Sequence, residues 1–147
     1  AILIDFINDI LYGDNTMNIA VIGMGHLGQA ITKYFNSKQL KLKITAAFDI
    51  DPNKVGKTID DIPCYAMSDF EDVMENNDIS IVVLSLPAKA ATELVVPIIN
   101  AGIKGVLNFT SAPLNFPQGI FVENYDITTI LEKVAYFVKA AEESENN

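Results

Sequence analysis

The sequence predicts a single α/β domain with a doubly wound parallel sheet, and three observations lead to that prediction. The chain has 147 residues, the size of one ordinary domain, and 50% of them are hydrophobic, enough to bury a core. From Met17 onward, apolar runs of strand length alternate with stretches of helical spacing. One run, residues 79–86, is apolar almost throughout, which is typical of a strand buried on both faces of a parallel sheet.

The alternation of strands and helices assigns each element in turn. Strands are expected at the apolar runs, residues 18–22, 43–49, 62–65, 79–86, 104–109 and 120–122. Helices are expected between and after them, over residues 28–39, 68–75, 87–102 and from 129 onward. Ser68 and Glu71 form a capping box, which predicts a helix whose first turn is capped by side chains. Pro87 and Gly102 suit the first turn and the end of the next helix.

A short amphipathic helix is expected before the sheet, where Ile4, Ile7 and Ile10 recur at helical spacing. We interpret it as the end of a linker from an upstream domain, because the chain starts at Ala1 with neither an initiator Met nor a secretion signal. The expected organisation is therefore a residual linker helix in residues 1–15, followed by the sheet domain in residues 16–147.

Charge and composition exclude several classes of protein. Ten Lys and no Arg face 19 acidic residues, for a net charge of −9, and such a surface would repel nucleic acid. No apolar run approaches the roughly 20 residues that cross a bilayer, so a membrane protein is excluded. A single Cys64 and a single His26 predict neither a disulfide nor a metal site, and they favour a cytoplasmic location.

Gly23, Gly25 and Gly28 form a Gly-x-Gly-x-x-Gly loop between an expected strand and an expected helix. Asp49 ends the following strand about 20 residues later, the separation found in dinucleotide-binding sites. Gly23 would allow the tight turn, Gly25 the approach of the pyrophosphate, and Gly28 the close packing of helix on strand. A carboxylate at the ribose, with no Arg in the chain, predicts a preference for NAD(H) over NADP(H).

The chain is not expected to be an enzyme. His26 falls inside the glycine loop, beside the cofactor phosphates and away from the ring that exchanges hydride. No other side chains form a recognisable catalytic constellation, and no residues remain for a substrate domain. Two alternatives stay open at this point: a fragment of an NAD-dependent dehydrogenase or reductase, and a nucleotide-binding module that regulates a partner protein.

Four stretches of the chain resemble the Rex family of redox-sensing transcriptional repressors, and they occur in the family's order, at residues 21–28, 46–56, 84–88 and 101–109. The resemblance implies the C-terminal Rossmann domain of a homodimer, with NADH or NAD+ as its ligand. It also implies that operator DNA is bound by an N-terminal winged-helix domain that this chain lacks. In the family, binding of NADH releases the DNA, so that transcription follows the NADH/NAD+ ratio.

The resemblance also implies the roles of individual residues. The cofactor-binding residues would be Gly23, Met24, Gly25, His26, Leu27 and Gly28 at the pyrophosphate, Asp49 and Ile50 at the adenosine, and Leu86, Pro87, Ala88, Asn108, Phe109 and Thr110 toward the nicotinamide. Tyr34 and Asp126 match a pair that senses closure of the dimer, although an ordinary helix N-cap accounts equally well for Asp126. Thr110 and Ser111 depart from the Ala-Pro that the family often has, and Ile127 departs from the aromatic residue of some relatives.

The last helix, at about residues 127–142, is exchanged between subunits in the family that the chain resembles. Its apolar residues at core spacing are Ile130, Leu131, Val134, Phe137 and Val138. Packing on the chain's own sheet would require the same apolar stripe. The residues alone leave both arrangements open.

Overall fold

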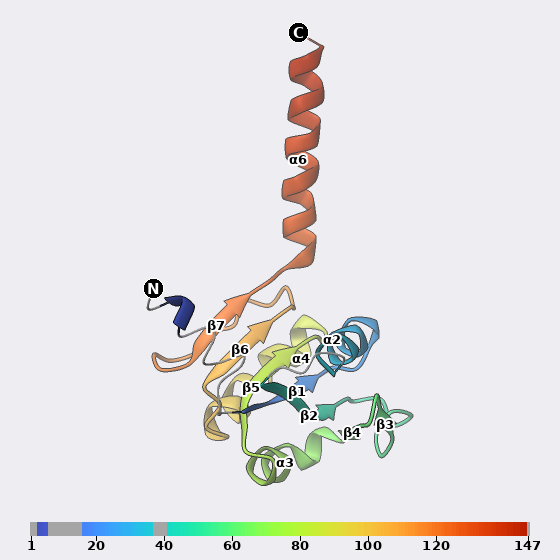
Figure 1. The fold of residues 1–147 in the computed structure, drawn as a ribbon, viewed down its shortest axis with the longest axis vertical. Helices are drawn as coiled ribbons and strands as arrows, with labels where there is room; N and C mark the ends of the chain where they lie inside the picture. Colours follow the sequence, from blue (N-terminus) through green and yellow to red (C-terminus); the bar gives the residue numbers. More distant parts are fainter. Residues whose placement is uncertain (1–2, 6–15, 37–40, 147) are drawn as a thin grey trace.

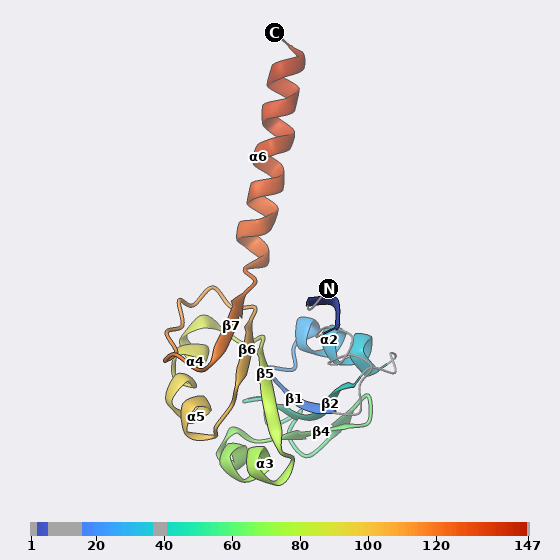
Figure 2. The same ribbon diagram turned by 60° about the vertical axis from the view of Figure 1, so that its left-hand side comes forward.

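The centre of the molecule is a seven-stranded sheet (Figures 1 and 2), seen in a computed structural model that describes residues 3–5, 16–36 and 41–146. Its strands are β1 (Met17–Ile22), β2 (Leu42–Phe48), β3 (Thr58–Ile59), β4 (Ile62–Tyr65), β5 (Ile79–Leu84), β6 (Gly105–Asn108) and β7 (Phe121–Asn124). Their order is β3-β4-β2-β1-β5-β6-β7, and every neighbouring pair is parallel except β3 with β4. The chain winds outward from β1 in both directions, which confirms the predicted doubly wound sheet.

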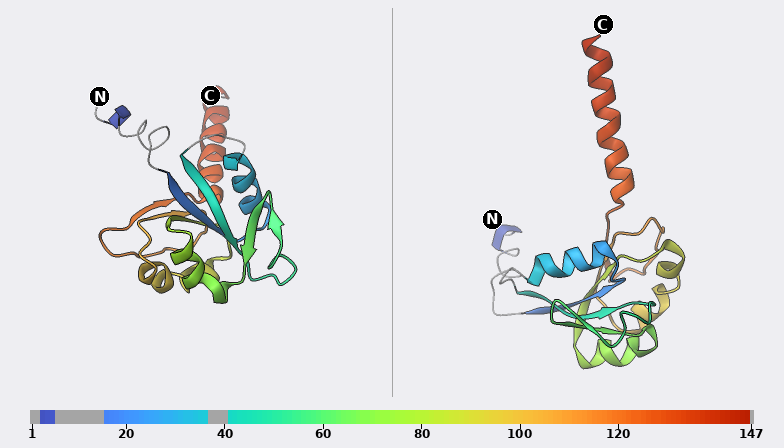
Figure 3. Two further views of the ribbon diagram at one scale, coloured as in Figure 1. Left: turned by 60° about the horizontal axis from the view of Figure 1, so that its bottom comes forward. Right: turned by 90° about the vertical axis from the view of Figure 1, so that its right-hand side faces the viewer.

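Helices cover the sheet on both faces, with α2 on one side and α3, α4 and α5 on the other (Figure 3). The bounds are α2 (His26–Asn36), a 3₁₀ turn (Met67–Asp69), α3 (Phe70–Asn76), α4 (Ala88–Thr92), α5 (Val95–Asn100) and α6 (Ile127–Glu145). Residues 3–5 are helical; the rest of the predicted linker helix, and the predicted end of the helix that follows the glycines, lie outside the described residues.

Alternate residues of the central strands enter two separate cores. Ile22, Phe48 and Leu84 pack with Phe70 and Ile98 of α3 and α5 in one cluster. The strand neighbours of these residues face the opposite way, where Val21, Ala47 and Val83 form a second cluster with Ile31 and Phe35 of α2. Strands β1 and β5 are therefore buried on both faces, as the near-continuous apolar run predicted.

Two local predictions were wrong. The capping box is not formed, because Asp69 is the N-cap of α3 without a side-chain hydrogen bond, and a 3₁₀ turn leads into the helix instead. The helix expected over residues 87–102 is two helices, α4 and α5. Pro97 explains the break, because it has no N–H for the Glu93 carbonyl and its ring would collide with that group in a continuous helix.

Strand β3 was not predicted, since it is only two residues long. It forms a hairpin with β4 through Asp60 and Asp61, whose φ angles of 50° and 67° are both left-handed. Two-residue hairpin turns need such angles at both positions and usually use Asn-Gly or Asp-Gly. An Asp-Asp pair is a weak signal of this turn in a sequence.

Helix α6 extends away from the sheet, and none of its residues is buried (Figure 1). Its apolar side chains lie at a spacing of three and four residues and are largely exposed: Ile127, Ile130, Leu131, Val134, Phe137 and Val138. Among the described residues, no helix combines the length and hydropathy that crossing a bilayer requires.

Candidate functional site

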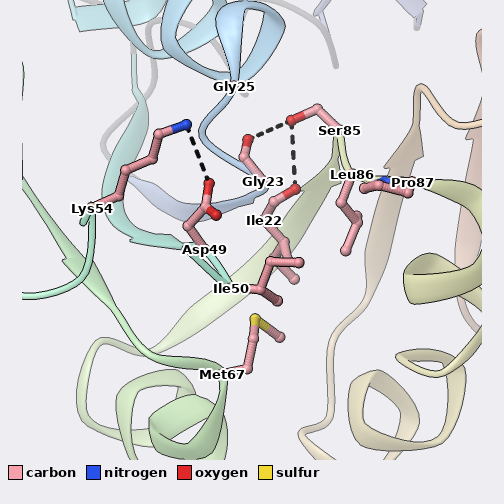
Figure 4. Close-up of a pocket in the computed structure, with 10 residues that line it drawn as sticks. All are labelled: Ile22, Gly23, Gly25, Asp49, Ile50, Lys54, Met67, Ser85, Leu86 and Pro87. Atoms are coloured by element: carbon pink, nitrogen blue, oxygen red, sulfur yellow. Dashed lines mark hydrogen bonds and ion pairs between the residues drawn. The ribbon is translucent and has the colours of Figure 1, made fainter. Parts of the chain in front are cut away.

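The carboxyl ends of β1, β2 and β5 meet around a cavity of about 240 Å³ (Figure 4). It is lined by Ile22, Gly23, Gly25, Asp49, Ile50, Lys54, Met67, Ser85, Leu86 and Pro87. The chain leaves β1 toward β2 on one side, whereas β5 and the later strands lie on the other. Doubly wound sheets bind ligands at this reversal of strand order.

Three glycines shape the loop after β1, each in a different way. Gly23 has a φ of +100°, and a Cβ atom there would lie 2.5 Å from the carbonyl oxygen of Ser85. A Cβ atom on Gly28 would collide with the carbonyl oxygen of Gly23. Gly25, in contrast, has no atom within 4 Å of the position of a Cβ, so its backbone borders open space. The fold itself requires Gly23 and Gly28, and the packing of the protein does not require Gly25.

Asp49 holds the glycine loop against the end of β2. Its Oδ2 atom accepts a hydrogen bond of 2.7 Å from the backbone N–H of Met24, and Oδ1 accepts one of 2.9 Å from the N–H of Asp51. Lys54 completes the corner: its Nζ donates to the carbonyl oxygen of Met24 at 2.9 Å and lies 3.9 Å from Asp49 Oδ2. Each carboxylate oxygen keeps a further lone pair that can accept a hydrogen bond.

Ser85 ties β5 to the same loop, and the sequence reasoning missed it. Its hydroxyl donates to the carbonyl oxygen of Gly23 at 2.6 Å. The only sequence signal was a polar residue near the carboxyl end of an otherwise apolar run. Met67 was missed as well, because it follows a short strand in a segment without a motif.

A second cavity of about 280 Å³ adjoins the first, since Ile50, Met67 and Leu86 line both. Its remaining lining residues are Phe70, Ala90, Glu93, Leu94 and Pro97. Leu86 and Pro87, which were expected toward the nicotinamide, line the same cavity as Asp49. Met24 lies in the loop between β1 and α2, His26 and Leu27 are the first two residues of α2, and Ala88 begins α4.

Asn108, Phe109 and Thr110 lie apart from these cavities, at the end of β6. The Asn108 Nδ2 atom donates to the carbonyl oxygen of Ala112 at 3.1 Å and to Asn124 Oδ1 at 3.0 Å. Its Oδ1 atom accepts from the Thr110 N–H at 3.0 Å and the Thr110 hydroxyl at 2.7 Å. The buried amide of Asn108 thereby joins the loop after β6 to β7.

Asp126 is the N-cap of α6, as the simpler of its two expected roles required. Its carboxylate accepts from the N–H groups of Thr128 and Thr129 and from the Thr129 hydroxyl, at 3.1, 3.4 and 2.9 Å. Tyr34 lies on α2, where 57% of its surface is exposed and its ring contacts Phe35 edge-on. A role of Tyr34 and Asp126 in sensing dimer closure stays a prediction.

Two further side chains bear on the chemistry of the site. Cys64 is buried in β4, and this burial, followed by the negative charge of Asp49, raises the pKa of its thiol. Among the residues that the structure describes, no three His, Cys, Asp or Glu side chains are placed to hold a metal ion. His26 is exposed at the start of α2.

Comparison with known proteins finds a matching family and similar sequences. Residues 14–112 match the model of the CoA binding domain family. The chain is 40% identical over 137 residues to the redox-sensing transcriptional repressor Rex of Listeria welshimeri, covering 93% of this chain and 64% of the relative. The chain thus spans about 64% of the length of the curated relatives that it matches.

Solved structures support the same similarity. RSP, a Rex-family repressor, superposes with a TM-score of 0.84 at 30% identity over 98% of this chain and 69% of RSP. Its complex with β-NADH gives 0.80 over 90% and 64% of the two chains, and its complex with β-NAD+ and operator DNA gives 0.81 over 98% and 66%, both at 31% identity. A UDP-D-quinovosamine 4-dehydrogenase from Vibrio fischeri, at 18% identity and a TM-score of 0.57 over 64% of this chain and 78% of the enzyme, shares the fold alone.

Proposed function

Because this chain belongs to the Rex family of redox-sensing repressors, we propose that it is the NAD(H)-binding part of a cytoplasmic transcriptional repressor that leaves its operator when NADH binds. The observation that carries this proposal is the open space over Gly25 beside the Asp49 carboxylate. With a net charge of −9, this domain is a poor partner for DNA, so another part of the repressor contacts the operator.

The residues at the site fit a dinucleotide. The space over Gly25 lets a pyrophosphate approach the backbone, and the 11-residue helix α2 begins there with unpaired N–H groups and the positive end of its dipole. Asp49 retains lone pairs for the ribose hydroxyls of the adenosine. A 2′-phosphate would meet this carboxylate, and Lys54 already donates to Met24, so NAD(H) is preferred over NADP(H).

The two halves of the ligand would meet different surroundings. Ile50, Met67 and Leu86 form apolar walls beyond Asp49 and would hold the adenine. Asn108, Phe109 and Thr110 end β6, on the far side of β5 from Asp49, and would border the nicotinamide. The nicotinamide is charged when oxidised and neutral when reduced, so apolar neighbours such as Phe109 favour the reduced form. A sensor requires such a difference in affinity, because equal binding would shift no equilibrium.

We further propose that two copies of the chain exchange α6. The apolar side chains of α6 are exposed. Phe121, in the edge strand β7, is 72% exposed as well. Leu107 of the neighbouring strand β6 and Phe109, directly after this strand, lie on the face that α2 covers and are only partly buried. An apolar helix without a core and a partly covered apolar sheet face complement each other. Exchange would couple the nicotinamide end of the site to the arrangement of the dimer.

Calorimetric titration of the protein with NADH, NAD+ and NADPH tests the proposed function. We expect NADH to bind most tightly, and we expect Asp49→Ala to weaken the binding of both NADH and NAD+. Equal affinities, or a preference for NADPH, would contradict a redox sensor and favour a dehydrogenase fragment. Unchanged NADH affinity in Asp49→Ala would show that the site lies elsewhere. For the full-length repressor, NADH should release operator DNA at concentrations at which NAD+ does not.

A further inference from the structure

The cavity beyond Asp49 contains one ionisable side chain. Its walls are apolar, from Ile50, Met67, Phe70, Leu86, Ala90, Leu94 and Pro97, and Glu93 is the exception. Glu93 is the C-cap residue of α4, at the break between α4 and α5. Within the described part of the chain, its carboxylate has neither a hydrogen bond nor an ion pair. Glu93 is therefore an exposed hydrogen-bond acceptor among the residues that line an otherwise apolar cavity.

The position of Glu93 relative to Asp49 limits which part of a bound nucleotide the Glu93 carboxylate can contact. The cavity that contains Glu93 shares Ile50, Met67 and Leu86 with the cavity that contains Asp49, so the two form a continuous surface. A nucleoside whose ribose binds Asp49 would lay its base against these three side chains. The end of the base that is remote from the sugar would then lie in the cavity that Glu93 lines.

We propose that Glu93 determines the specificity of the site for adenine, by accepting a hydrogen bond from its 6-amino group. The 6-substituent of a purine is the one remote from the glycosidic bond. In adenine it is a donor, whereas in hypoxanthine and guanine it is a carbonyl oxygen, which a carboxylate would repel. Replacing this donor by a carbonyl oxygen removes the hydrogen bond and sets two acceptors against each other. This inference rests on the proposed dinucleotide function and adds the residue that selects the base.

The break at Pro97 explains why a carboxylate can occupy this position. In one continuous helix, the Glu93 backbone carbonyl would have to pair with residue 97, which has no N–H. The chain instead turns between α4 and α5, and Glu93 and Leu94 both border the cavity at the turn. Glu93 thus contributes a polar side chain to the cavity, and the adjacent Leu94 contributes an apolar one.

Titration with NADH and with its hypoxanthine analogue, reduced nicotinamide hypoxanthine dinucleotide, tests the proposal. The two ligands differ only at the base, so the redox state and the pyrophosphate are matched. We expect the protein to bind NADH about tenfold more tightly than the analogue, the effect of one hydrogen bond to a charged group. Equal binding of the two ligands would overturn the proposal while leaving the proposed function intact. Failure to bind NADH at all would overturn both.

Variants separate a hydrogen bond from a general effect of charge. Glu93→Ala should weaken NADH binding several-fold and remove the preference over the analogue. In Glu93→Gln, the amide can accept from adenine or donate to hypoxanthine, so both ligands should bind. Glu71→Ala is the matched control, because it removes an acidic side chain of α3 that does not line this cavity. Glu93 is exposed, so thermal unfolding should be unchanged in its variants. A preference for NADH that persists in Glu93→Ala would overturn the proposal.

Discussion

The glycine corner, formed by Gly23, Gly28, Asp49, Lys54 and Ser85, contrasts with helix α6. In the corner, Asp49 and Ser85, which follow the ends of β2 and β5, and Lys54 from the turn after Asp49 all bond to the loop after β1, and each contact lies within this chain. In α6, 19 residues form a helix without burying a single side chain. The corner is complete in one copy of the protein, whereas α6 has an apolar stripe that one copy does not cover.

On the proposed function, this contrast separates the part of the domain that binds the ligand from the part that couples two copies. A ligand-binding loop is most effective when its geometry exists before the ligand arrives, since no ordering then opposes binding. A signal that must reach another subunit requires an element whose position the subunit itself does not determine. The proposed function therefore assigns binding to the hydrogen-bonded corner and coupling to helix α6, which buries no residue in one copy.

Gly28→Ala should have the largest effect on stability, because it disrupts the backbone packing that forms the glycine corner. The new methyl group would collide with the backbone of Gly23, which no side-chain rotation relieves. We expect a loss of about 3 kcal/mol or more in the free energy of unfolding, measured by urea denaturation. A fully stable variant would show that the loop can move away from α2.

Gly25→Ala separates binding from folding in the same loop. Its Cβ would meet no protein atom, so the free energy of unfolding should stay within about 0.5 kcal/mol of the original value. The methyl group would project into the space proposed for the pyrophosphate. NADH affinity, measured by calorimetry, should therefore fall at least about tenfold, or about 1.4 kcal/mol. Retained affinity would place the pyrophosphate elsewhere.

Val134→Asp tests whether α6 is an arm for a second copy. The side chain is 53% exposed in one copy, so its replacement should leave the unfolding of a monomer unchanged while abolishing dimers in light scattering. Lys133→Asp, an exposed charge change on the same helix, is the control. If α6 instead packed on its own sheet in solution, Val134→Asp would lower stability at every protein concentration.

Thr110→Val probes the connection between the two regions. The hydroxyl donates to Asn108 and accepts from the Ala112 N–H at 3.1 Å, and Asn108 in turn holds Asn124 of β7. Losing it leaves a buried N–H without a partner, which should cost about 1–2 kcal/mol of unfolding free energy. Ser111→Ala, at an exposed neighbour, should change nothing. Faster hydrogen exchange confined to β7 and the loop before it would confirm the connection.

The smallest effect concerns the pH dependence at Cys64. Because burial and Asp49 raise the pKa of the thiol, the folded protein holds this proton more tightly than the unfolded chain. The resulting stabilisation is present at neutral pH and is lost as the pH rises through the raised pKa. Cys64→Ala should lack this alkaline loss, and iodoacetamide should react with the thiol much faster in urea than in the folded protein.

Much of the fold and half of the site were predictable, for reasons that particular residues make clear. Gly23, Gly25, Gly28 and Asp49 carry their roles in local sequence, since a strand, a tight turn and a helix follow one another directly. The structure brings Gly23, Gly25 and Asp49 to one cavity and packs Gly28 against Gly23, and their roles in binding stay predictions. The strand runs were also predictable, because buried parallel strands are apolar on both faces.

The remaining features depend on segments that are distant in sequence. Ser85 meets Gly23 across 62 residues, and Glu93 reaches the same surface as Ile50 from a turn between two helices. No periodicity in the chain marks such meetings. For α6, the stripe of apolar residues was visible in the sequence, but an apolar stripe specifies that a helix needs a partner and not which partner it has. Side-chain chemistry and local spacing could thus be predicted from the sequence. The neighbours of each side chain depended on the tertiary structure, because the sheet brings together strand ends that are distant in sequence.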